Sequence, residues 1–570
     1  MNKKSIITAI LFFVVLSISV FVLIKNKKSG LSITYPFNEA LFPPEFPAPT
    51  FEWTSENSDA GSWEMELITE NKKYAIRTTT EHTSWTPEES AWDSIKQLSD
   101  YDNIYFSVKK AGDFGYGEEI FFKISQDTVG APILYRQMPI PSLLAERNLD
   151  SMNYMLINIG SKNPPHEAMK GFPVCGNCHS FTADGSTIAL DLDAGRRDKG
   201  GYFISEIEDT ILFNIKNYLS WSEIEKRRTF GLFSKISPDG RYVVTTVKDR
   251  VVFYNYPANS VENVVYSQLF FPVNGNLAIY DRQTKTLKEL PGANLEEFVQ
   301  SNAIWDPDGK SIIFSRADAL PRENIDEYIV QDADLINEFV ERKQTFKFDL
   351  YRIPFNDGDG GTAEPIMGAS ENGKSNYFPA VSPDGKWLVY CQAEHFMLLM
   401  PDSRLYIVPL EGGNARELKS NLNSLNSWHA WSPNSKWVVF ASKGLSAYTD
   451  MFLTHIDEIG DASIPVLVDK ARVFERVINY PEFVNRNPED VFLMDYDYVE
   501  LTHIQKAFQR GEREKAKELF YRLEAQQTYL FSEDYADLSM ILKRLGLTEE
   551  SKKYAKLAEE TVDSKIFDSE

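Results

Sequence analysis

The sequence predicts a mostly β protein in which a six-bladed β-propeller is preceded by a β-sandwich and followed by a short helical tail. A repeated turn in the middle of the chain, strand-like alternation near its start and helical periodicity near its end support this prediction. With 570 residues, 43% of them apolar, the chain is long enough for several packed domains. We expect an anchor at 1–30, a sandwich at 31–126, a linker with a closing strand at 127–170, the propeller at 171–499 and the tail at 500–570.

The first 30 residues contain an apolar segment between lysines. The stretch from Ser5 to Ile24 has no charged residue and lies between Lys4 and Lys25. Its 20 residues are enough to cross a hydrocarbon core of ~30 Å as a helix. Because no Ala-x-Ala-like cleavage site follows, we expect an uncleaved membrane anchor rather than a signal peptide.

Residues 31–126 have the pattern of a small β-sandwich. Trp63, Met65 and Leu67 alternate with glutamates, as expected for a strand with one buried face. The run Pro49-Thr-Phe-Glu-Trp53, with later tryptophans, resembles a fibronectin type III-like domain. This resemblance implies a spacer or docking module.

The central part of the chain repeats one kind of turn, and the repeat predicts the propeller. The turn residues stand 55, 69, 76 and 50 positions apart and are Asp184, Asp239, Asp308, Asp384 and Asn434. An apolar residue lies three positions before and four after each of them, which is typical of two antiparallel strands joined by a tight turn. Such sheets cannot bury both faces alone, so the units should close radially. A sixth unit near Asn487 is degenerate, and the linker is a candidate to complete it.

These units carry a family resemblance. Ser-Pro-Asp-Gly turns followed by strands such as Leu405-Tyr-Ile-Val408 resemble the repeats of TolB-like propellers. The span 130–487 is similar to a bacterial subfamily with Cys-Gly-x-Cys-His-Ser-Phe before the first repeat and Asn-Ser-Trp-His before a later one, here Asn426-Ser-Trp-His429. The α subunit of hydrazine synthase also resembles a propeller with such a motif.

From about residue 500 the periodicity becomes helical. Three small or apolar positions recur after 35 residues, as Gly511, Ala516 and Phe520 and then as Gly546, Ser551 and Ala555. This spacing is close to the 34-residue period of a tetratricopeptide (TPR) repeat. The resemblance implies a short helical segment that packs on the propeller or binds a protein partner.

The run Cys175-Gly-Asn-Cys-His179 is a complete motif for covalent haem attachment. The thiols of Cys175 and Cys178 would add to the haem vinyl groups, and His179 would be the proximal iron ligand. We therefore expect one covalent haem c. The alternatives are a redox dithiol, a zinc half-site or chance, but a thioredoxin-like βαβ setting and a second cysteine pair are missing from the sequence. Cys391, in an apolar strand, is expected to be an inert buried thiol.

A second axial ligand is suggested by the repeat. His179 lies five residues before Asp184, and His429 lies five before Asn434. The two histidines therefore occupy equivalent places on two leading strands, and His429 could be a distal ligand or acid/base, or a hydrogen-bonded channel histidine. Weaker candidates are the methionines at Met138, Met152, Met155, Met169 and Met400. Asp191, Asp193 and Asp198 lack calcium-loop spacing and are expected to form a solvated turn.

Charge and location limit the function. A net charge of -23 argues against nucleic acid as a partner. Because c-type haem is attached on the outer face of the bacterial inner membrane, we expect a single-pass inner-membrane protein with its bulk in the periplasm. Protein partners would dock on the sandwich or the tail.

The leading hypothesis is electron transfer or redox chemistry at the haem; if the protein is an enzyme, it is a haem-dependent oxidoreductase. The alternative is a non-enzymatic TolB-like protein-binding scaffold in which the cysteine pair is structural.

Overall fold

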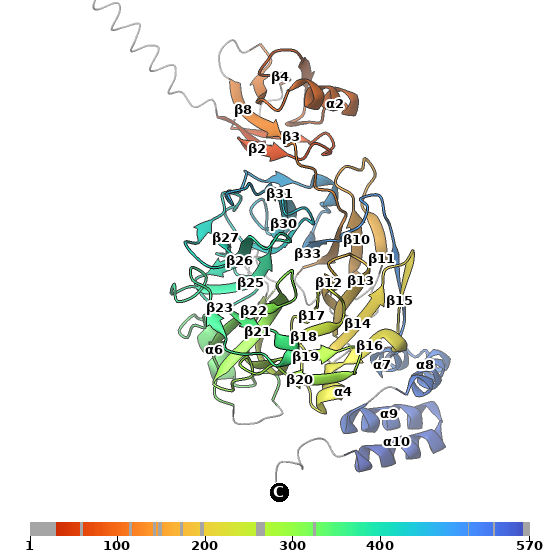
Figure 1. Ribbon diagram of the computed structural model, residues 1–570. Helices are drawn as coiled ribbons and strands as arrows, with labels where there is room; N and C mark the ends of the chain where they lie inside the picture. The colour runs from red at the N-terminus through yellow and green to blue at the C-terminus, as the bar shows by residue number, and fades with distance from the viewer. Residues whose placement is uncertain are drawn as a thin grey trace, which may run out of the picture. The chain divides into compact units, whose positions relative to one another are not determined.

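The computed structural model describes residues 30–56, 61–112, 117–140, 144–145, 151–170, 175–193, 199–257, 268–322, 327–499, 501–527 and 530–561 (Figure 1). The predicted anchor at 1–30 thus lies outside the described residues, apart from Gly30. Within those ranges no helix is long and apolar enough to span a membrane. Strands make up 41% and helices 17% of the described residues, which confirms the mostly β class. The chain forms two compact units, unit 1 with Met1–Thr128 and Ser463–Asp469 and unit 2 with Val129–Ala462 and Lys470–Glu570.

Unit 1 contains two sheets, with strand orders β1-β3-β6 and β2-β8-β7-β4-β5. The strands are β1 (Leu31–Tyr35), β2 (Ala40–Phe42), β3 (Phe51–Ser55), β4 (Trp63–Thr69), β5 (Ala75–Thr80), β6 (Ser84–Trp85), β7 (Ile104–Lys110) and β8 (Gly117–Ile124). The rings of Phe51 in β3 and Phe106 in β7 lie 4.3 Å apart, so aromatic side chains of the two sheets meet. The alternation predicted for β4 is confirmed, because Trp63, Met65 and Leu67 are buried. Helix α2 (Glu89–Leu98) was not predicted, and the fibronectin type III-like classification stays a prediction.

Unit 2 is built from sheets whose leading strands surround a common centre (Figure 1). Each leading strand contacts the next in a closed cyclic order, and the last contacts the first. In this order the strands are β12 (Cys175–Phe181), β17 (Lys235–Ile236), β21 (Phe298–Trp305), β25 (Ser375–Val381), β29 (Asn426–Trp431) and β33 (Arg476–Phe483). Such a ring of sheets is the arrangement of a propeller.

Further strands extend each sheet outward. The strand orders are β12-β13-β14-β16, β17-β18-β19 with β20 on β19, β21-β22-β23-β24, β25-β26-β27-β28 and β29-β30-β31, and a pairing of Gly275 in β19 with Val299 in β21 joins the second of these to the third. These outer strands are β13 (Thr187–Asp193), β14 (Gly201–Glu206), β16 (Tyr218–Ser220), β18 (Tyr242–Asn255), β19 (Gln268–Asp281), β20 (Thr286–Glu289), β22 (Ser311–Asp318), β23 (Asp349–Pro354), β24 (Glu364–Pro365), β26 (Trp387–Ala393), β27 (Arg404–Pro409), β28 (Arg416–Glu417), β30 (Trp437–Ser442) and β31 (Asp450–His455).

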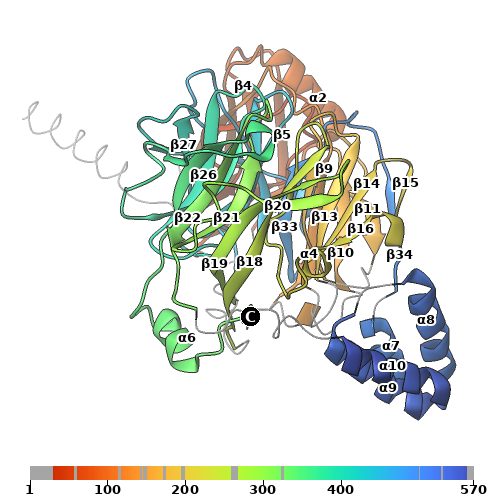
Figure 2. The same cartoon turned by 60° about the horizontal axis from the view of Figure 1, so that its bottom comes forward.

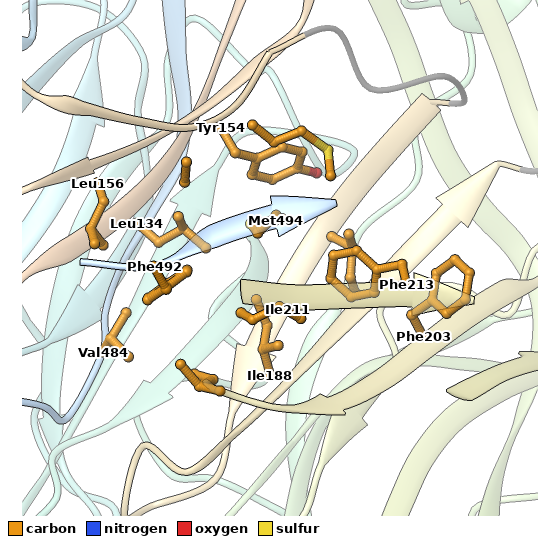
Figure 3. Close-up of a cluster of buried hydrophobic side chains, with 14 of the residues drawn as sticks. Leu134, Tyr154, Leu156, Ile188, Phe203, Ile211, Phe213, Val484, Phe492 and Met494 are labelled. Carbon is orange, nitrogen blue, oxygen red and sulfur yellow. The ribbon is translucent and has the colours of Figure 1, made fainter. Parts of the chain in front are cut away.

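The sheet that closes the ring joins two distant parts of the chain. Strand β33 pairs with β9 (Ile133–Pro139), which continues through β10 (Asn153–Ile157) to β11 (His166–Lys170). The segment expected to be a linker with one closing strand therefore supplies three strands. A buried apolar cluster joins this sheet to the β12 sheet and to the parallel pair β15 (Thr210–Asn214) and β34 (Leu493–Asp497) (Figure 3).

The repeated turns are present where the sequence predicted them. The hydroxyl groups of Thr182, Ser237 and Ser382 donate to the turn aspartates two residues later, at 2.5–2.7 Å. Ser432 makes the same bond to Asn434, at 2.6 Å. Four of the five turns are therefore fixed by the same local hydrogen bond, and the Asp308 turn has Asp306 in place of the hydroxyl residue.

The C-terminal part of unit 2 is helical. It contains α7 (Leu501–Gln509), α8 (Arg513–Gln526), α9 (Ser532–Leu545) and α10 (Thr548–Glu560), which pack as a group (Figure 2). Their shared core includes Ile504, Phe520 and Leu538, all without solvent exposure. The helical tail is thus confirmed, while its TPR-like character and its partner stay predictions. The shorter helices of unit 2 are α4 (Trp221–Glu225) and α6 (Ala333–Val340).

Candidate functional site

The predicted haem motif lies at the start of the leading strand β12. This strand pairs with β13, where Gly176 is opposite Leu192 and His179 is opposite Leu190. Three steps along β12 thus match two steps along β13, so β12 contains a bulge beside Cys178. The Cys178 side chain is partly exposed, whereas His179 is 1% exposed. The side chain of Cys175 is outside the described part of the structure.

His179 is enclosed by aromatic rings. Its ring centroid lies 5.5 Å from those of Phe181 and Tyr480 and 6.3 Å from that of Tyr154. Neither ring nitrogen makes a hydrogen bond of normal length and angle among the described residues, although the backbone of Leu134 lies close enough to interact with the ring. Because buried polar groups are nearly always well paired, this buried imidazole requires an explanation.

Electrostatics keep this imidazole neutral. Burial, with the positive charges of Lys235 and Arg136, lowers the pKa of His179 well below its usual value, and the backbone of Leu134 opposes this effect. The carboxylate of Glu482 lies 3.8 Å from Nε2, but with the ring neutral this contact is not an ion pair. A neutral imidazole retains the lone pair that a metal ligand needs.

Charged side chains from the two flanking sheets surround the motif. The Lys235 ammonium donates to the His179 carbonyl at 3.0 Å, lies 3.6 Å from Glu482 Oε2 and faces the Tyr480 ring at 4.9 Å. Burial raises the pKa of Glu482, and Lys235 opposes the rise. Arg136, from β9, donates to the carbonyl of Gly176. The three sheets with leading strands β33, β12 and β17 therefore meet at the motif.

The thiol of Cys178 is held in its protonated form. Burial raises its pKa to about 12, and Asp191 adds to the rise, while Lys235, Arg136 and a hydrogen bond with Tyr480 act in the opposite direction. Asp191 was expected in a solvated turn, which is wrong: it lies in β13, is 9% exposed and interacts with Ser234. The alternation of β13 places it between sheets. Asp193 forms an ion pair with Lys199, and Asp198 is outside the described residues.

The bulge of β12 recurs around the ring. Near the end of each leading strand lies an apolar residue, such as Ile236 or Trp305, that precedes the turn. In five leading segments the residue three positions before that apolar residue has a left-handed backbone, with φ between 45° and 56°. These residues are Phe233, Asn302, Phe378, Trp428 and Tyr480. Cys178 occupies the equivalent position on β12, as the sequence alignment of the repeats shows. This conformation is strained for residues other than glycine, and such strain gathers at functional positions.

His429 is held by the neighbouring sheet. Its Nε2–H donates to the carbonyl of Val389 at 3.2 Å, and Nδ1 lies 3.8 Å from the Cys391 sulfur. Burial lowers the pKa of His429 to about 4. None of the described contacts joins His429 to His179. The role as distal ligand stays a prediction, and these bonds favour the hydrogen-bonded alternative.

The remaining candidates are core residues. Cys391 has no solvent exposure, which confirms the prediction of a buried thiol. Four of the candidate methionines are buried, namely Met138, Met152, Met169 and Met400. Met155, in β10, is partly buried. In the described ranges no group of three or more His, Cys, Asp or Glu side chains is placed to hold a metal ion.

A cavity of about 310 Å³ lies beside the motif. Residues from all of the leading strands line it, together with the prolines of the repeated turns. Tyr480, Lys235 and Glu482 belong both to this lining and to the surroundings of His179. The sequence analysis did not identify these three residues. Aligning the repeats by their turns would have placed Lys235 and Glu482 directly before the apolar residues Ile236 and Phe483, at positions next to the channel.

Comparisons with known proteins give structural similarity alone. No family model matches the chain, and no curated protein matches it. Among solved structures it is similar to TolB from Acinetobacter baumannii, with 13% identity, a TM-score of 0.38 and coverage of 70% of this chain and 86% of that one. It is also similar to putative TolB from Agrobacterium tumefaciens, with 14% identity, a TM-score of 0.23 and coverage of 54% of this chain and 95% of that one. A further similar structure is Kuenenia stuttgartiensis hydrazine synthase, with 12% identity, a TM-score of 0.29 and coverage of 53% of this chain and 93% of that one. At these low identities and TM-scores, neither an activity nor a cofactor follows from the similarity.

Proposed function

We propose that the protein is a c-type haem protein in which a six-bladed, TolB-like propeller carries one haem on Cys175 and Cys178, with His179 as the proximal iron ligand. The buried His179, whose ring nitrogens lack a hydrogen bond of normal geometry among the described residues and which directly follows Cys178 in a complete attachment motif, is the observation that carries this proposal. Leaving a buried polar group unsatisfied costs roughly 1–3 kcal/mol, so a missing partner is the simplest explanation.

The nature of that partner is limited by the surrounding residues. The described residues contain no cluster of three metal-ligating side chains, and the side chain of Cys175 lies outside them. Haem iron needs one or two protein ligands, since the porphyrin supplies four nitrogens. His179, neutral and held between aromatic rings, fits that requirement.

When bound, the haem would supply an iron centre for one-electron transfer or for redox chemistry on a ligand. The chain's own residues hold the ligand in place. Tyr480, Phe181 and Tyr154 restrict the rotation of the His179 ring, and Lys235 fixes the backbone through the His179 carbonyl. The bulge and the flanking sheets exclude water from the imidazole.

A dithiol oxidoreductase is disfavoured by the electrostatics. Catalytic dithiols rely on a thiolate with a lowered pKa. The pKa of the Cys178 thiol is instead raised to about 12. The alternative function, a protein-binding scaffold with a structural cysteine pair, retains the propeller and its cavity without the haem.

The proposal includes location and partners. The segment from Ser5 to Ile24 would anchor the chain in the bacterial inner membrane, with the bulk in the periplasm where haem is attached. The sandwich or the helical tail would dock a protein that exchanges electrons with the haem. Membrane fractionation with protease treatment of spheroplasts tests the anchor: a soluble mature chain beginning near Leu31 would contradict it.

Intact-mass analysis tests haem attachment. The full chain, produced with a c-type maturation system, should carry the added mass of one haem, and the double variant Cys175→Ser/Cys178→Ser should not. Cys391→Ser is the matched control, because its thiol is buried in another sheet, and it should carry haem like the wild type. Unchanged mass in the matured wild type would end the proposal.

A further inference from the structure

The cavity of about 310 Å³ has the size and composition of a small-molecule site. Binding sites for small molecules begin at roughly 300 Å³ and combine apolar walls with a few polar groups. The walls here are mainly aromatic rings and prolines, among them Trp305, Phe378, Trp428, Trp431, Pro307 and Pro383. Lys235 and Glu482 are the charged residues of this lining.

Several other polar groups of the lining are already bonded. The indole N–H groups of Trp305 and Trp431 donate to the carbonyls of Lys235 and Ala380, both at 3.0 Å. The Asn302 side chain accepts from the backbone N–H of Phe378 at 2.6 Å. His429 donates to Val389.

Lys235 and Glu482 have bonding capacity left. Their charged atoms lie 3.6 Å apart, a weak contact that leaves Glu482 Oε2 without a hydrogen bond of normal length among the described residues. Their side chains keep 15% and 23% exposure, although both lie at the wall of the channel. Lys235 has three N–H donors, of which one is used by the His179 carbonyl. A ligand atom beside the pair could therefore accept from the ammonium and donate to the carboxylate.

We infer that this cavity binds a small, uncharged aromatic molecule with a hydroxyl group, that is, a phenolic compound. Its ring would pack on the aromatic and proline walls, and its hydroxyl would accept from Lys235 and donate to Glu482. A carboxylate ligand would meet the charge of Glu482, and an amine would meet that of Lys235, so either charge is disfavoured. Because Lys235 and Glu482 also lie beside His179, binding is tested on the chain with and without haem.

Phenol, benzoate and benzylamine are suitable probes because they share a ring and differ in charge. Binding is measured by calorimetry or ligand-observed NMR on the full chain in detergent, prepared with and without haem maturation. Phenol should bind at least tenfold more tightly than either charged probe. The variant Lys235→Met/Glu482→Met should lose at least tenfold in phenol affinity, because both hydrogen bonds to the phenol hydroxyl are removed.

A second variant tests the place of binding. Ala430 lines the cavity and is not itself part of the ion pair, so Ala430→Phe should fill the space and weaken phenol binding at least tenfold. If the Ala430→Phe protein does not fold, Ala380→Leu is used in its place. The control is Ala75→Phe, at an exposed site in unit 1. Unaltered phenol binding in the filled variant, or equal binding of the three probes, would overturn the inference. Haem attachment is scored separately by mass, so each proposal can fail alone.

Discussion

Replacing His429 by Gln should remove a pH-dependent part of the stability of unit 2. Burial lowers the pKa of His429 from 6.5 to about 4, while its Nε2–H donates to the Val389 carbonyl. Gln supplies an amide donor and has no titrating group. The variant therefore retains a similar contact and loses the proton equilibrium.

Protonation of His429 favours the unfolded chain. In the unfolded chain the imidazole takes up a proton near pH 6.5, whereas the folded site stays neutral down to about pH 4. The contribution of His429 to stability is therefore fully present above pH 6.5 and is lost as the pH falls to about 4. The difference between a pKa of 6.5 in the unfolded chain and about 4 in the folded chain corresponds to about 3 kcal/mol of unfolding free energy.

The assay is urea unfolding at pH 7 and pH 4, followed by tryptophan fluorescence, because Trp428 and Trp431 flank the histidine in β29. From pH 7 to pH 4 the free energy of unfolding should fall by about 3 kcal/mol more in the wild type than in His429→Gln. His82→Gln, at an exposed position in unit 1, is the control and should behave like the wild type. Identical pH profiles for wild type and His429→Gln would refute the reasoning. A change of haem spin state in His429→Gln would instead support the distal-ligand hypothesis.

Two further matched pairs test the closure of the ring. Ile211 and Leu212 are neighbours on β15, with 1% and 40% exposure. Ile211→Ala should therefore cost about 2–5 kcal/mol of unfolding free energy, and Leu212→Ala much less. Equal losses of unfolding free energy in urea would contradict the packing in Figure 3. Gly185 and Gly385 occupy equivalent turns with φ of +67° and +70°, but a Cβ at Gly185 would lie 2.4 Å from the Asn485 carbonyl oxygen, whereas one at Gly385 meets nothing within 4 Å. Gly185→Ala should therefore lower the melting temperature more than Gly385→Ala, and the same shift in both would mean that the close approach to Asn485 is absent.

Local patterns were enough to predict the repeated turns. Each has an aspartate or asparagine and flanking apolar residues, and all of these lie within ten positions of the chain. The burial of Cys391 followed from its apolar neighbours in the same way. By contrast, the strand number of 127–170 depends on pairing with β33, more than 300 residues later, and its Pro-rich and Asn-rich composition gave no sign of three strands.

The candidate site was predicted only in part for the same reason. The sequence identified Cys178 and His179 because the motif is contiguous. Lys235 and Glu482 reach His179 through ring closure, which brings the second and last leading strands to either side of the first. Asp191 looked solvated because neighbouring acidic residues suggested a turn, yet strand pairing carried it into the interior.

The central claim is that haem is covalently bound at Cys175 and Cys178. The most direct measurement is the haem content per chain of the matured protein after acid-acetone extraction, read from the pyridine haemochrome spectrum. The account predicts one haem per chain that resists extraction, in the wild type and in Cys391→Ser but not in Cys175→Ser/Cys178→Ser. A wild-type chain with no haem, or with haem that passes into the acetone, would contradict it.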